Sequence, residues 1–301
     1  MTLPKTSPRQ TQSYLRNLFD AHGIRPKNKL GQNFLVDLNL LDLLVRSAEL
    51  TRKDVVLEIG SGTGGLTGLL AAQAGAVLSI ELDPAFFELV QEAVGDFASV
   101  RLLHADALKN KNNLNPGMME AFEHQRLQFH CLHRKLVANL PYAVATPVIS
   151  NLLLSDYSFE RMVVTVQWEI AERLMAKPGS KEYSSLAVLV QSLAEVELIR
   201  QLPPSVFWPR PKVDSAIVLI KPDQAKREHV GDVIRFREFL RDLYTHRRKN
   251  LRGALAGWPS GRKDKAEVDH KLEELGLDGT VRAERLDLED HLRLSRAFGG
   301  L

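Results

Sequence analysis

The stretch VVLEIGSGTGG, residues 55–65, decides the fold. Its first five residues form a short apolar run broken only by Glu58, which is typical of a strand buried inside a parallel sheet. Glycine-rich residues follow, and a helical pattern then runs from Leu66 to Ala74. A strand, a glycine loop and a helix in this order indicate an α/β unit that binds its ligand beyond the carboxyl end of the strand.

The alternation of strands and helices continues after this unit. Short apolar runs predict strands, and stretches with helical spacing separate them. We therefore predict an α/β fold with a doubly wound, Rossmann-like parallel sheet. The predicted strands cover residues 76–81, 100–104, 136–139, 161–167, 196–201 and 215–221. The predicted helices among them cover residues 84–94, 146–154, 169–176 and 184–192.

The sequence divides into three regions. Residues 1–28 are polar and basic, which fits a basic arm or a targeting segment, and we favour the arm. Residues 29–222 hold the strand and helix pattern. From residue 223 the strands stop and apolar residues recur at helical spacing, as at Val233 and Phe236, so 223–301 is predicted to be a small all-helical domain.

The composition excludes several protein classes. The chain has 301 residues, 44% hydrophobic and 26% charged, and no apolar run approaches the roughly 20 residues that span a bilayer. The single cysteine, Cys131, excludes an internal disulfide and fits a reducing compartment, so we expect a cytoplasmic protein. We also expect a monomer without membrane contact. Three histidines between residues 109 and 135, His133 among them, have no companions suited to a metal site, and no metal is expected.

The glycine loop fits two cofactor templates. Gly60, Gly62 and Gly65 satisfy the G-x-G-x-x-G pattern of dinucleotide sites. Gly60, Gly62 and Gly64 satisfy the G-x-G-x-G pattern of methyltransferases. The glycines alone therefore leave both an NAD-dependent oxidoreductase and a methyltransferase open.

Three acidic residues distinguish the two cofactors. Glu58, two residues before the first glycine, repels a pyrophosphate and attracts the ammonium end of a methionine moiety. Glu81 ends the second predicted strand, where a carboxylate can accept both ribose hydroxyls. Asp106 follows the third strand in Asp106-Ala107 and can accept from an adenine amino group. Three acids around one pocket favour the cationic S-adenosyl-L-methionine over NAD.

Two side-chain amides precede the first helix of the sheet region. Gln32 and Asn33 stand between Gly31 and the apolar Phe34-Leu35. Short amides at such a junction can bind the polar end of a ligand, or they can cap the following helix.

The fourth predicted strand ends in Asn139-Leu140-Pro141-Tyr142. Pro141 stops the strand and keeps Leu140 extended, so the Asn139 carboxamide and the Leu140 or Pro141 carbonyl present hydrogen-bond acceptors. Tyr142 adds a flat face. Acceptors beside a stacking ring suit the exocyclic amino group of an extruded nucleobase, although an ordinary strand-end turn has the same residue types.

A proline-rich loop precedes the last strand. Residues 203–215 read PPSVFWPRPKVDS, and the prolines stiffen the backbone. We expect this loop to present Phe207 opposite Tyr142, where the two rings could hold a flipped base between them.

Basic residues gather in the helical region and predict either a phosphate-binding face or a solvated face. The candidate RNA-binding residues are Arg241, Arg247, Arg248, Lys249 and Arg252.

From about Tyr14 to the C-terminus the chain resembles the ribosomal RNA adenine N6,N6-dimethyltransferases, and it is most similar to the small-subunit enzymes. It departs from their usual pattern at Ser61, Trp168 and Ser184, where proline, a basic residue and glycine are commoner, and the 110–135 connection is long. The motifs that carry the resemblance are KLGQNFL at 29–35, EIGSGTG at 58–64, ELD at 81–83, DA at 106–107, NLPY at 139–142 and FWPRPKVDS at 207–215.

The resemblance implies a class I methyltransferase fold and transfer of methyl groups from S-adenosyl-L-methionine to adenine N6 in small-subunit ribosomal RNA, within a pre-assembled subunit during ribosome biogenesis. Dimethylation is implied by the resemblance alone. Two alternatives remain: a large-subunit enzyme of the antibiotic-resistance type, and a non-catalytic nucleic-acid-binding relative. The residues expected to contact the cofactor are Gln32, Asn33, Leu35, Glu58, Gly60, Gly62, Gly64, Glu81, Asp106, Ala107 and Asn139.

Overall fold

The computed structural model describes residues 10–27, 31–257 and 264–299. Expectations for residues 1–9 and 28 of the arm, and for Lys29 and Leu30, lie outside the described residues. Two compact units make up the chain: the first runs to Ala171 and includes Glu197–Pro222, and the second comprises Glu172–Val196 and the chain from Asp223. Among the described residues, no helix has the length and apolar content needed to cross a membrane.

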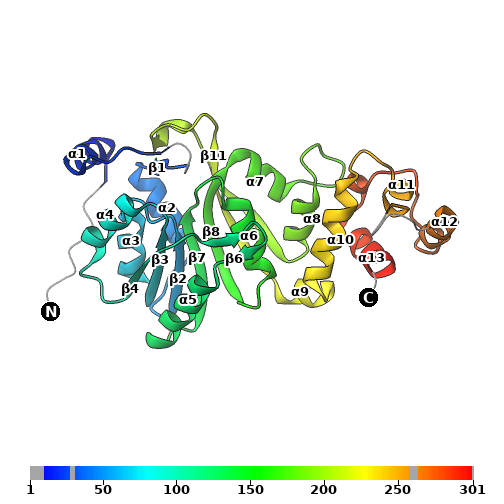
Figure 1. Ribbon diagram of the computed structural model, residues 1–301, viewed down its shortest axis with the longest axis horizontal. Helices are drawn as coiled ribbons and strands as arrows, with labels where there is room; N and C mark the ends of the chain where they lie inside the picture. Colours follow the sequence, from blue (N-terminus) through cyan, green and yellow to red (C-terminus); the bar gives the residue numbers. More distant parts are fainter. Residues whose placement is uncertain (1–9, 28–30, 258–263, 300–301) are drawn as a thin grey trace. The chain divides into compact units, whose positions relative to one another are not determined.

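A seven-stranded sheet forms the core of the first unit, in the order β4-β3-β2-β7-β8-β11-β9 (Figure 1). Neighbours from β4 to β8 are parallel, and β11 is antiparallel to β8. The predicted α/β fold is confirmed. The strands are β2 (Asp54–Ile59), β3 (Ala76–Glu81), β4 (Val100–His104), β7 (His133–Asn139), β8 (Phe159–Gln167), β9 (Ala194–Leu202) and β11 (Ser215–Pro222).

The strand order reverses beside β2. The chain proceeds from β2 through β3 to β4 in one direction, and then returns to place β7 and β8 on the other side of β2. Such a reversal leaves a crevice at the carboxyl ends of the strands, which is where α/β proteins bind ligands. The glycine loop after β2 and Asn139 at the end of β7 therefore lie at the same edge of the sheet.

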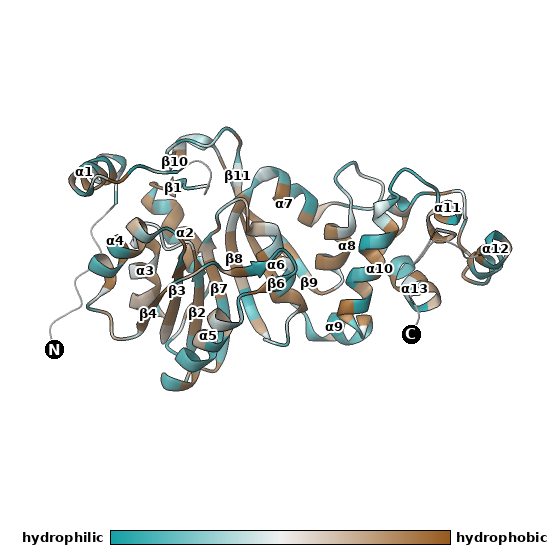
Figure 2. Cartoon of the chain, viewed as in Figure 1, coloured by the Kyte–Doolittle hydropathy of each residue, from teal (hydrophilic) through white to brown (hydrophobic). Residues whose placement is uncertain are grey.

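Helices pack apolar faces on this sheet. Every residue of β2 and β3 is buried, and Figure 2 shows the apolar character of these strands. One core cluster joins Leu41 and Leu70 from two helices to Val56 and Val137 from the sheet. The helices of this region are α2 (Leu38–Ser47), α3 (Gly65–Gln73), α4 (Pro84–Val94), α5 (Pro116–Gln128), α6 (Ala145–Leu154) and the first half of α7 (Trp168–Met175).

An N-terminal helix, α1 (Gln12–His22), begins at the capping residue Thr11 and ends at Gly23, whose φ of 64° favours glycine. Phe19 of α1 packs against Phe34, Phe86 and Trp208, with ring centroids 5.3–5.4 Å apart. The paired short strands β1 (Phe34–Leu35) and β10 (Phe207–Trp208) carry two of these rings, so α1 is fixed beside the start of the sheet region.

The connection between β4 and β7 is ordered. The turn-forming residues between 109 and 117 predict a mobile surface loop, and this prediction is wrong. Strands β5 (Leu108–Asn110) and β6 (Asn113–Leu114) pair as a hairpin, and Asn115 caps α5. The Asn115 side chain also donates to the backbone carbonyl of Asp106 at 2.8 Å. This bond ties the hairpin to a predicted site residue.

The described part of the second unit is helical apart from the first residues of β9. The periodicity of Val233, Phe236 and Leu240 correctly predicts the buried face of α10. Residues 172–196 group with this unit and not with the sheet region, because α8 packs its buried apolar residues against α10. The remaining elements, which include two short 3-10 helices, are α8 (Ser185–Gln191), η2 (Pro204–Val206) in the first unit, α9 (Gln224–Val230), α10 (Val233–Thr245), α11 (Leu251–Leu255), α12 (Lys265–Glu274), η3 (Ala283–Arg285) and α13 (Leu288–Phe298).

Candidate active site

One pocket lies at the carboxyl ends of β2, β3 and β7. Most residues predicted to bind a cofactor line it, and these include Asn139 of the Asn139–Tyr142 turn; Pro141 of the same turn also lines it. Gly64, Leu140, Tyr142 and Phe207 are not among the lining residues. The predicted residues that line the pocket are Gln32, Asn33, Leu35, Glu58, Gly60, Gly62, Glu81, Asp106, Ala107, Asn139 and Pro141.

The glycine loop owes its shape to three left-handed glycines. Gly60, Gly62 and Gly64 have φ values of 87°, 56° and 75°, which side chains disfavour. A Cβ on Gly60 would also lie 3.1 Å from the Pro141 ring, so the turn after β7 packs directly on this loop. A Cβ on Gly64 would lie 2.9 Å from Val90, so Gly64 serves helix packing behind the pocket.

Glu81 fixes the loop to the end of β3. Its Oε2 accepts the Gly62 N–H at 2.9 Å, and its Oε1 accepts the N–H groups of Leu82 and Asp83 at 3.0 and 2.9 Å. Burial raises the pKa of this carboxyl despite these bonds. The carboxyl is therefore rigidly held, facing the pocket from the strand that neighbours the glycine loop.

Glu58 is fully buried beneath the glycine loop. Its Oε2 accepts the hydroxyls of Thr67 and Ser79 at 2.7 and 2.5 Å, whereas Oε1 has no hydrogen-bond partner among the described residues. Burial raises the pKa of Glu58 to about 8, so the group is mainly protonated at neutral pH in this structure. A neighbouring cation, such as the ammonium group expected from the sequence, would favour the ionised form of this carboxyl.

Asp106 and Ala107 close the pocket beyond β4. The exposed Asp106 accepts the Leu108 N–H through Oδ1 at 2.9 Å, which leaves Oδ2 for a ligand. Leu82, which is 47% exposed, lines the pocket beside them and offers an apolar surface. Leu82 was not predicted from the sequence, although its place directly after Glu81 is a signal that could have identified it.

The two amides before α2 act differently. Gln32 accepts from the Lys27 N–H at 2.6 Å and donates to Asp83 Oδ2 at 2.9 Å, so it supports the residue that caps α4. Neither amide caps α2, because Asp37 does so. Asn33 contributes its backbone carbonyl, which accepts from the Asn139 side chain.

Asn139 stands at the end of β7 with its side chain oriented. Its Nδ2 donates to the carbonyl of Asn33 at 2.9 Å. An amide is planar, so fixing the nitrogen fixes the direction of Oδ1. The Pro141 carbonyl already accepts the Val144 N–H at 3.0 Å, where the chain turns into α6.

The two aromatic candidates have different surroundings. The Tyr142 hydroxyl bonds to Ser215 Oγ at 2.6 Å, and burial raises the pKa of Tyr142. Phe207 is only 2% exposed and belongs to the hydrophobic core around Leu35. The expectation that the proline loop presents Phe207 is wrong: pairing of Phe207 with Leu35 directs the ring into the core.

The basic residues of the second unit are partly neutralised. Arg247 pairs with Glu284 at 2.9 Å, Arg252 with Asp269 at 2.6 Å and Arg241 with Asp242 at 3.0 Å. A surface recess includes Arg247, Arg248 and Lys249, and within the described ranges Arg248 and Lys249 are exposed without an acidic partner.

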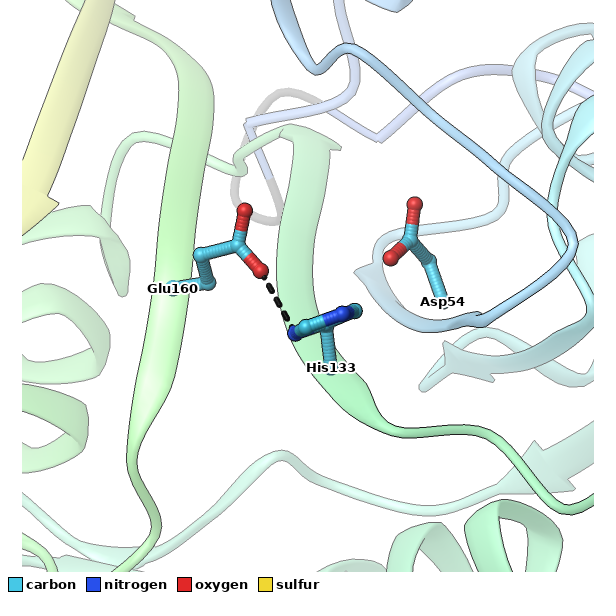
Figure 3. Close-up of side chains that lie close together, drawn as sticks. All are labelled: Asp54, His133 and Glu160. Atoms are coloured by element: carbon cyan, nitrogen blue, oxygen red, sulfur yellow. Dashed lines mark ion pairs between the residues drawn. The ribbon is translucent and has the colours of Figure 1, made fainter.

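His133 has two acidic companions, contrary to the expectation from sequence. Asp54, His133 and Glu160 lie at the starts of β2, β7 and β8, the end of the sheet away from the pocket, with candidate ligand atoms within 4.8 Å of one another (Figure 3). His133 Nδ1 lies 2.8 Å from Glu160 Oε2. Asp54 pairs with the buried ammonium of Lys135 at 3.0 Å, which balances its charge without a metal.

Comparison with known protein families identifies the family of this chain. The model of the family described as "Ribosomal RNA adenine dimethylase" matches residues 23–297. The chain belongs to the ribosomal RNA adenine dimethylase family. This membership confirms the resemblance stated from the Asn139–Tyr142 and glycine-loop motifs.

Two curated members of the family illustrate the similarity. The chain is 37% identical to ribosomal RNA small subunit methyltransferase A of Ligilactobacillus salivarius, covering 94% of this chain and 93% of that protein. It is 38% identical to the protein of the same name from Clostridium botulinum, covering 93% of this chain and 96% of the relative.

Two solved structures share the fold of this chain. A dimethyladenosine transferase from Plasmodium falciparum superposes with a TM-score of 0.71 at 26% identity, covering 87% of this chain and 96% of that one. The 23S rRNA methyltransferase ErmE superposes with a TM-score of 0.62 at 24% identity, covering 88% and 99%. The second match shows a shared fold alone.

Proposed function

We propose that this chain transfers methyl groups from S-adenosyl-L-methionine to N6 of adenine in small-subunit ribosomal RNA, giving N6,N6-dimethyladenosine during ribosome assembly. One observation carries the proposal: an oriented amide, Asn139, shares a pocket with the acidic residues Glu81 and Asp106. Membership of the adenine dimethylase family supports the reaction, and relatives named as small-subunit methyltransferases support the substrate.

The pocket suits a sulfonium nucleoside better than a dinucleotide. Along the sheet edge, Asp106 after β4 would hold the adenine, Glu81 at the end of β3 the ribose, and Glu58 beneath the loop after β2 the ammonium group. The unpartnered Oε1 of Glu58 gives a cation a buried acceptor, whereas a pyrophosphate would meet the carboxyl groups of Glu81 and Asp106. When bound, S-adenosyl-L-methionine supplies an electrophilic methyl group on a positively charged sulfur.

The residues of the turn activate the target nitrogen by position. Asn139 Oδ1 accepts one N6–H, and the Leu140 carbonyl accepts the other, since the Pro141 carbonyl is already occupied by Val144. Holding both hydrogens draws the nitrogen toward a tetrahedral geometry and aims its lone pair at the methyl group. No side-chain base is required, because the methylated nitrogen becomes acidic and releases its proton to water.

Tyr142 stacks on the flipped adenine in this proposal, and its hydrogen bond to Ser215 keeps the ring in place. Phe207 has no part in it, because its ring is in the core.

Ribosomal RNA contacts the second unit through Arg248 and Lys249, with Arg241, Arg247 and Arg252 available to bind phosphates when they exchange their acidic partners. The substrate is the RNA of a pre-assembled subunit, whose shape a basic face can recognise. We expect a cytoplasmic monomer.

Methyl transfer to purified subunits tests the function. Small and large ribosomal subunits that lack the modification are incubated with the protein and tritiated S-adenosyl-L-methionine, and the labelled nucleosides are identified. We expect N6,N6-dimethyladenosine in the small subunit. Label confined to the large subunit would make the chain a large-subunit enzyme, and cofactor binding without label would make it a non-catalytic relative.

A further inference from the structure

Gln10 reaches the glycine loop from the N-terminal segment. Its Nε2 donates to the Thr63 carbonyl at 2.8 Å, and the Thr63 hydroxyl donates to its Oε1. Both residues are only 6% exposed, and both line the pocket. A paired contact between residues 53 positions apart holds the segment before α1 on the loop.

Gly65 makes room for this contact. Unlike the three glycines before it, Gly65 does not have a positive φ, so the backbone conformation does not require glycine there. A Cβ at this position would lie 2.8 Å from Gln10 Oε1 and 3.0 Å from its Cδ. The fourth glycine of the loop, which also completes the dinucleotide pattern, is therefore explained by the close approach of Gln10.

The contact lies on the glycine-loop side of the pocket. Asp106 and Glu81 stand at β4 and β3, whereas Gln10, Thr63 and Gly65 meet where the loop after β2 enters α3. The first turn of α3 has free backbone N–H groups, and Gly64 gives its start no side-chain cap. The side-chain amide of Gln10 keeps a second N–H beyond the one that it donates to Thr63. Together with Glu58, this side of the pocket offers donors for a carboxylate and an acceptor for an ammonium group.

We propose that Gln10 is a positioning residue for the amino-acid end of the cofactor. It holds Thr63 and the glycine loop in place, and it lines the pocket where the carboxylate and ammonium groups of the methionine part would bind. The proposal rests on the proposed function, because it takes S-adenosyl-L-methionine as the cofactor.

Anchoring of α1 alone does not require Gln10. Phe19 packs among three aromatic rings, and Leu15 is buried beside it, so the helix keeps its place when the Gln10 amide is removed. Loss of Gln10 is therefore expected to change ligand binding without unfolding the segment.

Calorimetric titration with two ligands tests the proposal on the full chain. S-adenosylhomocysteine has the amino-acid end, and 5′-methylthioadenosine lacks it. In Gln10→Ala we expect S-adenosylhomocysteine to bind about five- to tenfold more weakly, the range of one or two ordinary hydrogen bonds, with methylthioadenosine affinity unchanged. The KM for S-adenosyl-L-methionine rises by the same factor, and kcat at saturation is retained.

Gln12→Ala is the matched control, because Gln12 is an exposed glutamine close to Gln10 in the sequence. This variant should bind both ligands with unchanged affinity. Gln10→Glu keeps the side-chain length but replaces the donor with an acceptor, and it should also weaken the binding of S-adenosylhomocysteine selectively. Equally weakened binding of both ligands, or unchanged binding of both, would overturn the proposal. Failure of the unaltered protein to bind either ligand would instead contradict the proposed function.

Discussion

The side-chain nitrogen of Asn139 donates to the backbone carbonyl of Asn33 at 2.9 Å, across 106 positions of sequence. The two motifs that flank the pocket are thereby joined, and the bond leaves the acceptor end of the Asn139 amide free to receive a hydrogen from a substrate amine. Asn33 acts on Asn139 through its main chain, while its own side chain donates to the Gly31 carbonyl at 3.2 Å.

The Tyr142–Ser215 hydrogen bond gives a pairwise prediction. Tyr142→Phe keeps the ring but loses the hydroxyl, and Ser215→Ala removes its partner. Each should lower kcat for methyl transfer several-fold, and the double variant should be no worse than either single one, because all three lose the same bond. Single-turnover rates with saturating cofactor measure this, and simple additivity of the two effects would contradict the assigned contact.

Glu58 predicts a pH dependence of stability. Its pKa is raised from 4.5 to about 8 in the folded protein, so its stabilising contribution is complete below pH 4.5 and is lost as the pH rises toward 8. The neutral variant Glu58→Gln should not lose stability in this way. Its melting temperature should therefore rise relative to that of the unaltered protein as the pH increases from 5 to 8, by ~2–4 °C for each kcal/mol of difference in the free energy of unfolding. Thermal unfolding of the ligand-free proteins at both pH values measures it, and parallel pH profiles would refute the buried, protonated assignment.

Phe207 distinguishes a core residue from a substrate contact. Phe207→Ala should destabilise the protein by ~3–5 kcal/mol, because it leaves a cavity in the core. Phe207→Leu fills most of that volume and should keep near-normal turnover at permissive temperature. Denaturant unfolding and methyl-transfer rates report the two effects. A stable Phe207→Leu protein with no activity would show that the ring serves catalysis.

Arg248 and Lys249 predict a salt-dependent RNA affinity. Replacing either with alanine should weaken binding of small-subunit RNA several-fold and reduce the slope of log K against log salt by about 1. Arg46→Ala, an exposed arginine on α2, is the matched control. Filter binding at several salt concentrations checks this; unchanged slopes in both variants would remove these residues from the RNA interface.

Much of the site could be predicted because parallel strands end at a common edge. Glu81 and Asn139 end apolar runs, Asp106 follows one, and Glu58 stands one residue before the end of another. The topology of an α/β sheet brings such positions together. The shape of the glycine loop was equally readable, since its left-handed residues must be glycine.

The features that sequence reasoning missed depend on long-range geometry. The direction of Phe207 follows from its pairing with Leu35, and a shift of one residue would reverse it. The companions of His133 follow from the alignment of Asp54 with His133 in neighbouring strands. Gln10 meets Thr63 across 53 positions, and the protonation of Glu58 follows from burial, so no local pattern indicates either.

Replacement of Asn139 tests the central claim most directly. Asn139→Ala and Asn139→Asp are measured in single-turnover methyl transfer to small subunits with saturating S-adenosyl-L-methionine, beside titration of S-adenosylhomocysteine. We expect both variants to lose at least ~10²-fold in rate, as when one preorganised hydrogen-bonding group is removed from an active site, while cofactor affinity changes little. Near-normal transfer by a cofactor-saturated Asn139→Ala enzyme would contradict the assignment of this amide to the target nitrogen.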